Sequence, residues 1–488
     1  MHIVFAASEC VPFAKTGGLA DVVGALPPEL VRLGHQVTVY LPLYKATRSL
    51  LPEELTFAIR SITIPFPYYN RFAGIVDGGL RDGVQYYFVD CPELFDRDGL
   101  YGPKTGAGDY ADNAERFGLF CRAVLEASKQ LGVPEIFHVH DWQAAFLSIL
   151  LKTVYYFDPA LRSAAVVLTI HNAGYQGWFP PKTVPELLLP WDIFTFEKVE
   201  QNDTFNWLKG GLVYSDYLTT VSRTYAEEIQ TPEFGSGLDP VLRRRHWDLR
   251  GILNGVDYSH WDPAHDGKLA AHYTADNLQG KVECRRDLLH AFGLPSVPDT
   301  TPVIGIVSRF ATQKGLDLIA QIADQLTERN IALVALGSGE QYYESFFRAW
   351  AARKPNQIAV QVKYDDALAH KVEAGSDIFL MPSRYEPSGL NQMYSLKYGT
   401  VPVVRATGGL EDTVEEWNAD NRTGTGFKFY GYQTGDFLWA IDRALWVYHN
   451  DKEGWQTLMR NGMAKDYSWS HPAREYVEVY EEVLRRRG

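Results

Sequence analysis

Short runs of consecutive apolar residues, separated by stretches of helical character, constrain this chain more than any other feature of its sequence. A first series of runs covers residues 2–7, 36–41, 85–89, 136–140, 165–170 and 217–221. The alternation starts again after residue 300, with runs at 302–308, 331–336, 358–362, 377–381 and 401–405. Apolar runs of this length that alternate with helices are typical of buried parallel strands. The sequence therefore predicts an α/β protein with two doubly wound, Rossmann-like parallel sheets facing across a cleft.

The length of the chain also favours two domains, because 488 residues exceed what one hydrophobic core ordinarily holds. Residues 257–300 are polar and contain three prolines, which is typical of a linker. We predict an N-terminal domain over residues 1–260, a C-terminal domain over 261–470 and a final helix over 471–488. Residues 58–112 combine Gly, Tyr and Phe with little helical periodicity, and we interpret them as a hairpin-rich insertion with a surface loop.

Charge and cysteine content exclude several classes of protein. Lys and Arg total 47 and Asp and Glu total 60, so the net charge is −13. General binders of polyanions are basic, so neither nucleic acid nor an acidic membrane is an expected partner. Four cysteines without CxxC spacing predict neither a disulfide framework nor a zinc ribbon. With no signal-peptide pattern and no long apolar segment, we expect a cytoplasmic protein, or a plastid one if a transit peptide has been removed.

A turn with two glycines, Lys15-Thr16-Gly17-Gly18-Leu19-Ala20-Asp21, follows the first strand and opens a helix. Glycine lets the backbone approach a ligand, N–H groups at a helix start attract anions, and Lys15 adds a positive charge for a phosphate. The spacing matches neither a P-loop nor GxGxxG. The alternative is a plain strand-to-helix turn in which Asp21 complements the helix dipole.

Polar residues end two further strands of the N-terminal half. Phe137-His138-Val139-His140-Asp141-Trp142-Gln143 ends one, and Thr169-Ile170-His171-Asn172 ends the next. Such residues point into the ligand-binding crevice of an open α/β sheet. We interpret the first motif as a sugar-binding edge in which Asp141 accepts hydroxyl hydrogen bonds. A helix N-cap for Asp141 and a structural role for His171 are the alternatives, and no acidic ligands beside His138 and His140 support a metal.

The first strand of the C-terminal half is followed by Ser308-Arg309-Phe310-Ala311-Thr312-Gln313-Lys314-Gly315. Two cations five residues apart across a loop can hold a diphosphate and neutralise a nucleotide leaving group. With no acidic metal motif nearby, we expect departure of that group to be assisted by cations alone. A solvated surface pair is the alternative.

The segment Pro382-Ser383-Arg384-Tyr385-Glu386-Pro387-Ser388-Gly389-Leu390 precedes a helix that we expect to begin near Ser388. Free N–H groups of Gly389 and Leu390 can bind a phosphate, and Glu386 can hold sugar hydroxyls beside it. A plain N-cap is the alternative.

Taken in order, these motifs resemble the bacterial glycogen synthase and plant starch synthase family over nearly the whole chain. The matching segments are 15–27, 138–145, 169–172, 208–211, 254–257, 308–315 and 382–387. The resemblance implies a GT-B glycosyltransferase whose final helix crosses back to the N-terminal domain. It implies glucose transfer from ADP-glucose to the non-reducing end of an α-1,4-glucan (glycogen, starch or maltodextrin), with retention of configuration and no metal or other cofactor.

The resemblance also assigns roles to individual residues. The diphosphate is expected on Lys15, Arg309 and Lys314, assisted by Gly18 and the N–H groups of Gly389 and Leu390. The glucosyl unit is expected on His171, Asn254, Asp21 and Glu386, and the adenine beside Tyr364. The acceptor side is expected to comprise Tyr101, Asp141, Trp142 and Asn172. The groups expected to drive the reaction are Glu386, His171, Lys314, Arg309, Lys15 and Asp141.

Two positions depart from the family pattern. Ser388 stands where a cysteine usually follows Glu-Pro, which keeps hydrogen bonding but removes thiol reactivity. Tyr394 stands where the wider retaining GT-B pattern places a second glutamate, so we assign no second carboxylate.

Other functions stay open at this point. A UDP-glucose-preferring or granule-bound, starch-type synthase has the same motifs, and a non-catalytic glucan-binding scaffold would need only part of them. A glycoside hydrolase needs two carboxylates roughly 5–9.5 Å apart, and the candidates Glu386 and Asp141 belong to different predicted domains. The sequence leaves processivity, oligomeric state and regulation undetermined.

Overall fold

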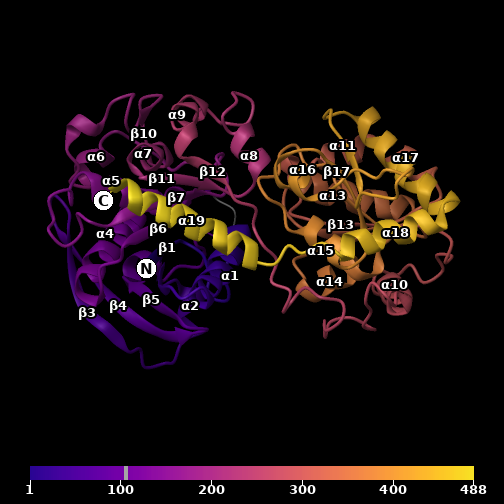
Figure 1. The fold of residues 1–488 in the computed structure, drawn as a ribbon, viewed down its shortest axis with the longest axis horizontal. Coiled ribbons are helices and arrows are strands. Elements are labelled where there is room, and N and C mark those ends of the chain that lie inside the picture. Colours follow the sequence, from indigo (N-terminus) through magenta and orange to yellow (C-terminus); the bar gives the residue numbers. More distant parts are fainter. Residues whose placement is uncertain (104–107, 488) are drawn as a thin grey trace. The chain divides into compact units, whose positions relative to one another are not determined.

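The computed structural model describes residues 1–103 and 108–487, which fold into two compact units. Unit 1 consists of Met1–Val221, Ala226–Ile252 and Trp469–Gly488, and unit 2 consists of Ser222–Tyr225 and Leu253–Ser468. Figure 1 shows both units, with the yellow C-terminal helix as part of unit 1. Within the described ranges, no helix is both long and apolar enough to cross a membrane.

Unit 1 is built on a nine-stranded sheet with the order β12-β11-β7-β6-β1-β2-β5-β4-β3 in the described residues. These strands are β1 (His2–Ala6), β2 (Gln36–Pro42), β3 (Phe57–Pro65), β4 (Asn70–Arg81), β5 (Val84–Asp90), β6 (Ile136–His140), β7 (Ala165–Ile170), β11 (Tyr217–Thr220) and β12 (Leu249–Gly251). All neighbours are parallel except β3 with β4 and β4 with β5. The six predicted strands and the hairpin insertion are therefore confirmed.

Helices and a small sheet complete unit 1. The helices are α1 (Gly18–Arg32), α2 (Lys45–Arg48), α3 (Pro92–Phe95), α4 (Asn113–Leu131), α5 (Asp141–Lys152), α6 (Thr183–Glu186), η1 (Trp191–Ile193), α7 (Trp207–Tyr214), α9 (Asp239–Arg244), η2 (His246–Asp248) and α19 (Ser470–Arg487). The helix α8 (Arg223–Glu228) begins in unit 2 and ends in unit 1. A three-stranded antiparallel sheet that the sequence did not predict is made of β8 (Trp178–Phe179), β10 (Thr204–Asn206) and β9 (Glu200–Gln201).

The C-terminal helix α19 packs into the core of unit 1 together with α1. Its buried Tyr476 and Tyr480 belong to the same apolar cluster as Ile3 and Phe5 of β1 and Val37 of β2. Alternate residues of a strand point to one face of a sheet, so these strand residues form the face that the two helices cover.

Unit 2 is built on a sheet whose strands are all parallel, with the order β15-β14-β13-β16-β17-β18 in its described residues. The strands are β13 (Val303–Val307), β14 (Ala332–Gly337), β15 (Ile358–Val362), β16 (Ile378–Met381), β17 (Val401–Arg405) and β18 (Phe427–Phe429). The helices are α10 (Gln279–Ala291), η3 (Thr312–Lys314), α11 (Leu316–Gln321), α12 (Ala323–Thr327), α13 (Gln341–Arg353), α14 (Asp366–Gly375), α15 (Asn391–Lys397), α16 (Gly408–Thr413), α17 (Thr434–Asn450) and α18 (Lys452–Met463). The five predicted strands are confirmed, and β18 adds a sixth.

Both faces of the unit 2 sheet are buried, which explains its continuous apolar runs. Ile304 and Ile306 pack into one apolar cluster, while Val303 belongs to another. A strand with helices on both sides has no polar face and therefore reads as an unbroken apolar segment.

The linker predicted within residues 257–300 is wrong, because these residues fold as part of unit 2. They contain α10, and the ring of Trp261 lies between His370 and Tyr394, at 3.6 and 3.8 Å between ring centroids. Pro263, Pro295 and Pro298, which suggested a linker, lie in turns and loops outside α10.

Candidate active site

The predicted site residues of unit 1 follow the carboxyl ends of neighbouring parallel strands. Lys15 and Gly18 come after β1, Asp141 after β6 and His171 after β7, and these three strands are adjacent in the sheet. The carboxyl ends of parallel strands share one edge, where open α/β sheets bind their ligands. The structure thus brings the N-terminal candidates to one edge of a single sheet.

The predicted glycine turn leads into α1, which begins at Gly18. Lys15 Nζ lies 2.7 Å from Asp21 Oδ1, and the side chain of Lys15 is 42% exposed. A Cβ atom added to Gly17 or Gly18 would meet no atom within 4 Å, so the backbone there faces open space. An exposed ion pair contributes little to stability, and the Lys15 ammonium remains accessible to an anion.

Asp141 adopts a strained backbone conformation at the start of α5. Its φ is +53°, in the left-handed region that side chains rarely occupy, and its Oδ1 accepts a hydrogen bond of 2.7 Å from the backbone N–H of His171. Burial raises the pKa of the Asp141 carboxyl to about 7, assisted by the nearby charge of Glu9 and opposed by the N–H groups of His171 and Asn172. Asp141 therefore caps the turn after β7 rather than α5, so the N-cap alternative is wrong. Strain and a raised pKa are both common at functional sites.

The histidines behind this edge are neutral. His171 Nε2 lies 2.9 Å from His140 Nδ1, and burial lowers the pKa of His171 to about 3. Burial also lowers the pKa of His138 and His140 well below the ordinary value. His138 bonds Tyr480 of α19 at 2.8 Å and Thr169 of β7 at 2.6 Å. A neutral His171 can exchange hydrogen bonds with a sugar hydroxyl but carries no charge to it.

The acceptor-side residues differ in how much surface they offer. Trp142 is 7% exposed, and its ring lies against Phe117 and Trp207 at 5.3 and 6.2 Å between centroids. Little of the ring is exposed, and the acceptor role of Trp142 stays a prediction. The Tyr101 hydroxyl is bonded within unit 1, and the side-chain oxygen of Asn172 accepts a backbone N–H two residues later.

In unit 2, an ion pair joins the ends of two neighbouring strands. Lys314, after β13, donates a hydrogen bond of 2.7 Å to Oε2 of Glu386, which follows β16. Ser383 donates to the same oxygen at 2.9 Å. Glu386 is 5% exposed, and no described residue donates to its Oε1. A buried carboxylate held on one oxygen by a cation leaves the other free for a hydroxyl ligand.

Gln313 links the predicted cations to the loop that carries Glu386. Its side-chain oxygen accepts from Arg309 at 3.4 Å, and its side-chain nitrogen donates to the carbonyl of Tyr385 at 3.3 Å. Its carbonyl accepts the backbone N–H of Arg384 at 2.8 Å. Arg309 is exposed, so its guanidinium is accessible to an anion.

The helix expected from Ser388 begins three residues later, at Asn391 of α15. No side chain caps it, so the N-cap alternative for Glu386 is wrong. In the described chain the backbone N–H groups of Gly389 and Leu390 donate to no other residue, which leaves them available to an anion. The Ser388 hydroxyl donates to the carbonyl of Gly389 at 3.3 Å.

Two glycines after β17 press against the Glu386 loop. A Cβ atom at Gly408, whose φ is +45°, would lie 2.0 Å from the carbonyl oxygen of Glu386. A Cβ atom at Gly409 would lie 1.8 Å from the carbonyl oxygen of Ser388. The Gly409 N–H donates to the Glu386 carbonyl at 3.0 Å. These contacts require glycine at both positions, and they fix the position of the loop formed by residues 386–388 at the edge of the sheet.

Asn254 and Tyr364 belong to unit 2, and neither forms a hydrogen bond with Lys314 or Glu386 in the described residues. Asn254 is 5% exposed, and its Oδ1 has no hydrogen-bond partner among the described residues. Tyr364 follows β15 and is 81% exposed, so its ring offers a stacking face. The joint action of the unit 1 and unit 2 residues on one ligand stays a prediction.

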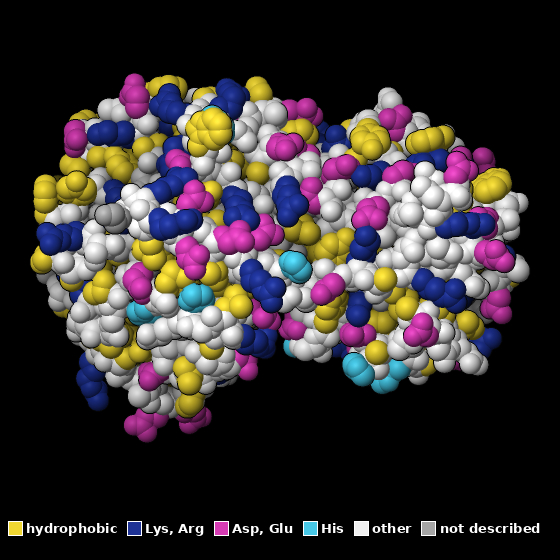
Figure 2. All heavy atoms as spheres, in the orientation of Figure 1, with side chains coloured by type: hydrophobic (Ala, Val, Ile, Leu, Met, Phe, Trp, Pro, Cys, Tyr) yellow, Lys and Arg dark blue, Asp and Glu magenta, His cyan; other side chains and the backbone are white. Residues whose placement is uncertain are grey.

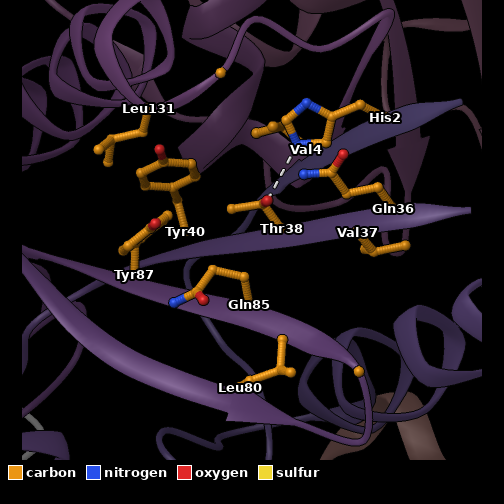
Figure 3. Close-up of a pocket in the computed structure, with 12 residues that line it drawn as sticks. His2, Val4, Gln36, Val37, Thr38, Tyr40, Leu80, Gln85, Tyr87 and Leu131 are labelled. Atoms are coloured by element: carbon orange, nitrogen blue, oxygen red, sulfur yellow. Dashed lines mark hydrogen bonds between the residues drawn. The ribbon is translucent and has the colours of Figure 1, made fainter.

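Two other features of the surface are distinct from these residues. A cavity of about 230 Å³ in unit 1 lies over β1, β2 and β5 and contains none of the predicted site residues (Figure 3); His2 bonds Thr38 there at 3.1 Å. Over the described chain, no group of three or more His, Cys, Asp or Glu side chains is placed to hold a metal ion. On the face shown in Figure 2, cationic and anionic side chains are interspersed.

Known proteins resemble the chain over both units. A family model described as the starch synthase catalytic domain matches residues 2–244, and one described as glycosyl transferases group 1 matches residues 295–451. A glycogen synthase from Koribacter versatilis (strain Ellin345) is 58% identical over 488 residues, covering 100% of this chain and 99% of that relative. The chain belongs to the glycogen synthase family. A family member from Anaeromyxobacter sp. (strain Fw109-5) is 47% identical over 98% of this chain and 99% of its own length.

Solved structures agree with this family and identify the fold. The catalytic domain of starch synthase IV from Arabidopsis thaliana, bound to ADP and acarbose, superimposes with a TM-score of 0.88 at 34% identity, covering 99% of each chain. A sucrose-phosphate synthase from Thermosynechococcus elongatus, 15% identical over 100% of each chain with a TM-score of 0.60, shares the fold. The protein is therefore an enzyme, a glucosyltransferase with the GT-B fold, as the motifs predict.

The sequence analysis missed two groups that organise the site of this family member. Glu9 accepts hydrogen bonds from the glycine turn and from Tyr101, and His140 bonds His171. A buried charge directly after the first strand is the signal that could have revealed Glu9. His140 belongs to the motif that we interpreted as a sugar-binding edge, but the residue itself was considered only as a metal ligand.

The raised pKa of Asp141 predicts a pH dependence of stability. The folded carboxyl has a pKa of about 7 against an ordinary 3.8, so the unfolded chain ionises first as pH rises. Asp141 thus costs stability progressively between about pH 4 and pH 7, by at most about 4 kcal/mol. Asp141→Asn, which tolerates positive φ, should gain thermal stability relative to the wild type at pH 8 but not at pH 4. An unchanged difference between the two pH values would contradict the shift.

The close approach of Gly409 predicts that a single methyl group disables the Glu386 loop. Gly409→Ala forces Ser388 and Glu386 away from their positions, and a displacement of about 1 Å can cost about 10²-fold in rate. We expect glucosyl transfer to fall by about that factor while circular dichroism is unchanged. Gly435→Ala is the control, since a Cβ atom there meets nothing within 4 Å. Equal loss in both variants would disprove the role of the contact.

Proposed function

We propose that the enzyme transfers glucose from ADP-glucose to the non-reducing end of an α-1,4-glucan with retention of configuration. The observation that carries the proposal is the Lys314–Glu386 pair at the carboxyl ends of β13 and β16, beside accessible Arg309. A diphosphate needs cations, and a glucosyl unit needs a hydroxyl acceptor such as Glu386 Oε1 next to them. The names of the relatives and the ADP and acarbose bound to the Arabidopsis enzyme support the same substrates.

Unit 2 supplies groups suited to the nucleotide sugar. Arg309 and Lys314 neutralise the diphosphate, and the free N–H groups of Gly389 and Leu390 donate to it. Tyr364, with its exposed ring, stacks beside the adenine. Buried Asn254, whose Oδ1 lacks a partner among the described residues, and Glu386 accept hydrogen bonds from the glucosyl hydroxyls.

Unit 1 supplies groups suited to hydroxyls and to the acceptor. Neutral His171 and the carboxyl group of Asp141 exchange hydrogen bonds with sugar hydroxyls, and Asn172 and Tyr101 contact the acceptor glucan. Lys15, with Gly18 and Asp21, completes the binding of the activated sugar. The negative charge of the diphosphate is neutralised by the lysine and arginine side chains and by the backbone N–H groups, so the proposed reaction requires no metal.

The reaction that these groups favour is a front-face substitution. The bond between the anomeric carbon and the phosphate oxygen breaks while Arg309 and Lys314 stabilise the charge that develops on ADP. The acceptor hydroxyl forms the new bond from the face that ADP leaves, and its proton passes to the departing phosphate. No second carboxylate is needed, in agreement with Tyr394 at the position where other GT-B enzymes carry one.

Donor specificity tests the proposal directly. The enzyme is offered radiolabelled ADP-glucose or UDP-glucose, with glycogen or short maltodextrins, in the presence and absence of EDTA. We expect label in the glucan from ADP-glucose, at a rate that EDTA does not change. Exclusive use of UDP-glucose would show that ADP-glucose is not the donor. Release of glucose from unlabelled glycogen without a nucleotide sugar would indicate a hydrolase instead of a transferase.

The proposed role of Lys314 predicts a selective loss of turnover. Lys314→Ala removes the charge that stabilises ADP as it departs, so kcat should fall by about 10²–10³-fold. Binding of maltoheptaose, measured by calorimetry, should change by less than about threefold, because the acceptor groups are elsewhere. Lys428→Ala is the matched control, since Lys428 pairs with Glu411 at 2.9 Å in the same unit. If Lys314→Ala had the same kcat as the wild type, Lys314 would have no role in stabilising the departing ADP.

A further inference from the structure

Glu9, directly after β1, has a carboxylate buried among hydrogen-bond donors. It is 3% exposed. Its Oε2 accepts the backbone N–H groups of Thr16 and Gly17 at 2.5 and 3.1 Å. Its Oε1 accepts the hydroxyls of Thr16 and Tyr101 at 2.6 and 2.5 Å. No lysine or arginine of the described chain forms an ion pair with it.

Four hydrogen-bond donors, instead of a cation, stabilise the buried carboxylate of Glu9. An ionised carboxylate in a buried site is unfavourable unless its oxygens are hydrogen-bonded, and hydrogen bonds to a charged acceptor are the strong ones. Loss of any one donor leaves the charge less satisfied, so each donor is held in place by the other three. The carboxylate therefore couples the positions of the two segments that bond to it.

The two segments that share Glu9 have different expected ligands. Thr16 and Gly17 lie between Lys15 and Gly18, in the turn that we assign to the activated sugar. Tyr101 lies more than 80 residues away in the sequence, in the segment that we assign to the glucan. Glu9 and the neighbouring Ser8, which lies 2.8 Å from the Tyr101 hydroxyl, join the two.

We propose that Glu9 is a positioning residue through which glucan binding and nucleotide binding strengthen one another. The inference rests on the proposed function. A glucan that orders Tyr101 also orders the glycine turn through the shared carboxylate, so the nucleotide then binds a turn that is already fixed. By linkage, ADP must raise the affinity for the glucan by the same factor.

The test measures this mutual effect rather than either affinity alone. ADP is titrated into the full-length enzyme by calorimetry, with and without saturating maltoheptaose, and maltoheptaose is titrated with and without ADP. For the wild type we expect the Kd of each ligand to fall by about fivefold or more in the presence of the other. Tyr101→Phe, which removes only the hydroxyl, should reduce that factor to below about twofold.

Tyr44→Phe is the matched control. Tyr44 is also a buried tyrosine of unit 1, but its hydroxyl has no hydrogen-bond partner among the described residues. Its removal should leave the mutual effect at the wild-type value. Glu9→Gln, whose amide can accept from the two N–H groups and donate to the two hydroxyls, should keep the effect, whereas Glu9→Ala should abolish it. A purely structural role would instead weaken both ligands without changing the factor between them.

Two results would overturn the inference: no mutual effect in the wild type, or a full effect in Tyr101→Phe. Transfer from ADP-glucose is measured in the same preparation. A wild-type enzyme that transfers glucose but shows no mutual effect leaves the proposed function intact and refutes the role of Glu9. An enzyme that uses no ADP-glucose refutes the proposed function, and the inference with it.

Discussion

The parallel direction of the strands is the constraint on which the candidate site depends. A parallel sheet has all its strand ends of one kind at one edge, and the backbone groups there are unpaired and face ligands. In each unit, the residues after adjacent strands therefore meet without being close in the sequence. Lys314 and Glu386 are 72 positions apart yet form an ion pair. The apolar cores serve to hold these edges in place.

Much of the fold followed from the sequence, because burial on both sheet faces leaves a direct trace in the residue pattern. All eleven predicted apolar runs are strands, and the motifs after them lie at the sheet edges. Irregular segments leave no such trace. The prolines near residue 260 favoured a linker, but Trp261 is packed in unit 2, and the two-residue strand β8 is too short to show periodicity.

The site was predictable in its charges and less so in its exposure. The glycine turn after Lys15 and the choice of cations and a carboxylate follow from what a phosphate and a sugar need, but the ion pair of Lys314 with Glu386 was not predicted. Whether an aromatic ring is exposed depends on neighbours distant in the sequence, so the packing of Trp142, which we expected on the acceptor side, against Phe117 and Trp207 was not predicted. Glu9 escaped notice because a single acid in an apolar segment forms no pattern, and its four donors come from elsewhere.

The stack of His370, Trp261 and Tyr394 limits how this enzyme can be remodelled. The rings of Trp261 and Tyr394 are stacked and nearly parallel, with 3° between their planes. Exchanging Tyr394 for an acid, as a route toward relatives with a paired carboxylate, would remove one wall of this sandwich and place a charge against an indole. The start of unit 2 would then lose its anchor on α15. An acidic substitution at residue 394 therefore requires a compensating substitution at residue 261, both in evolution and in engineering.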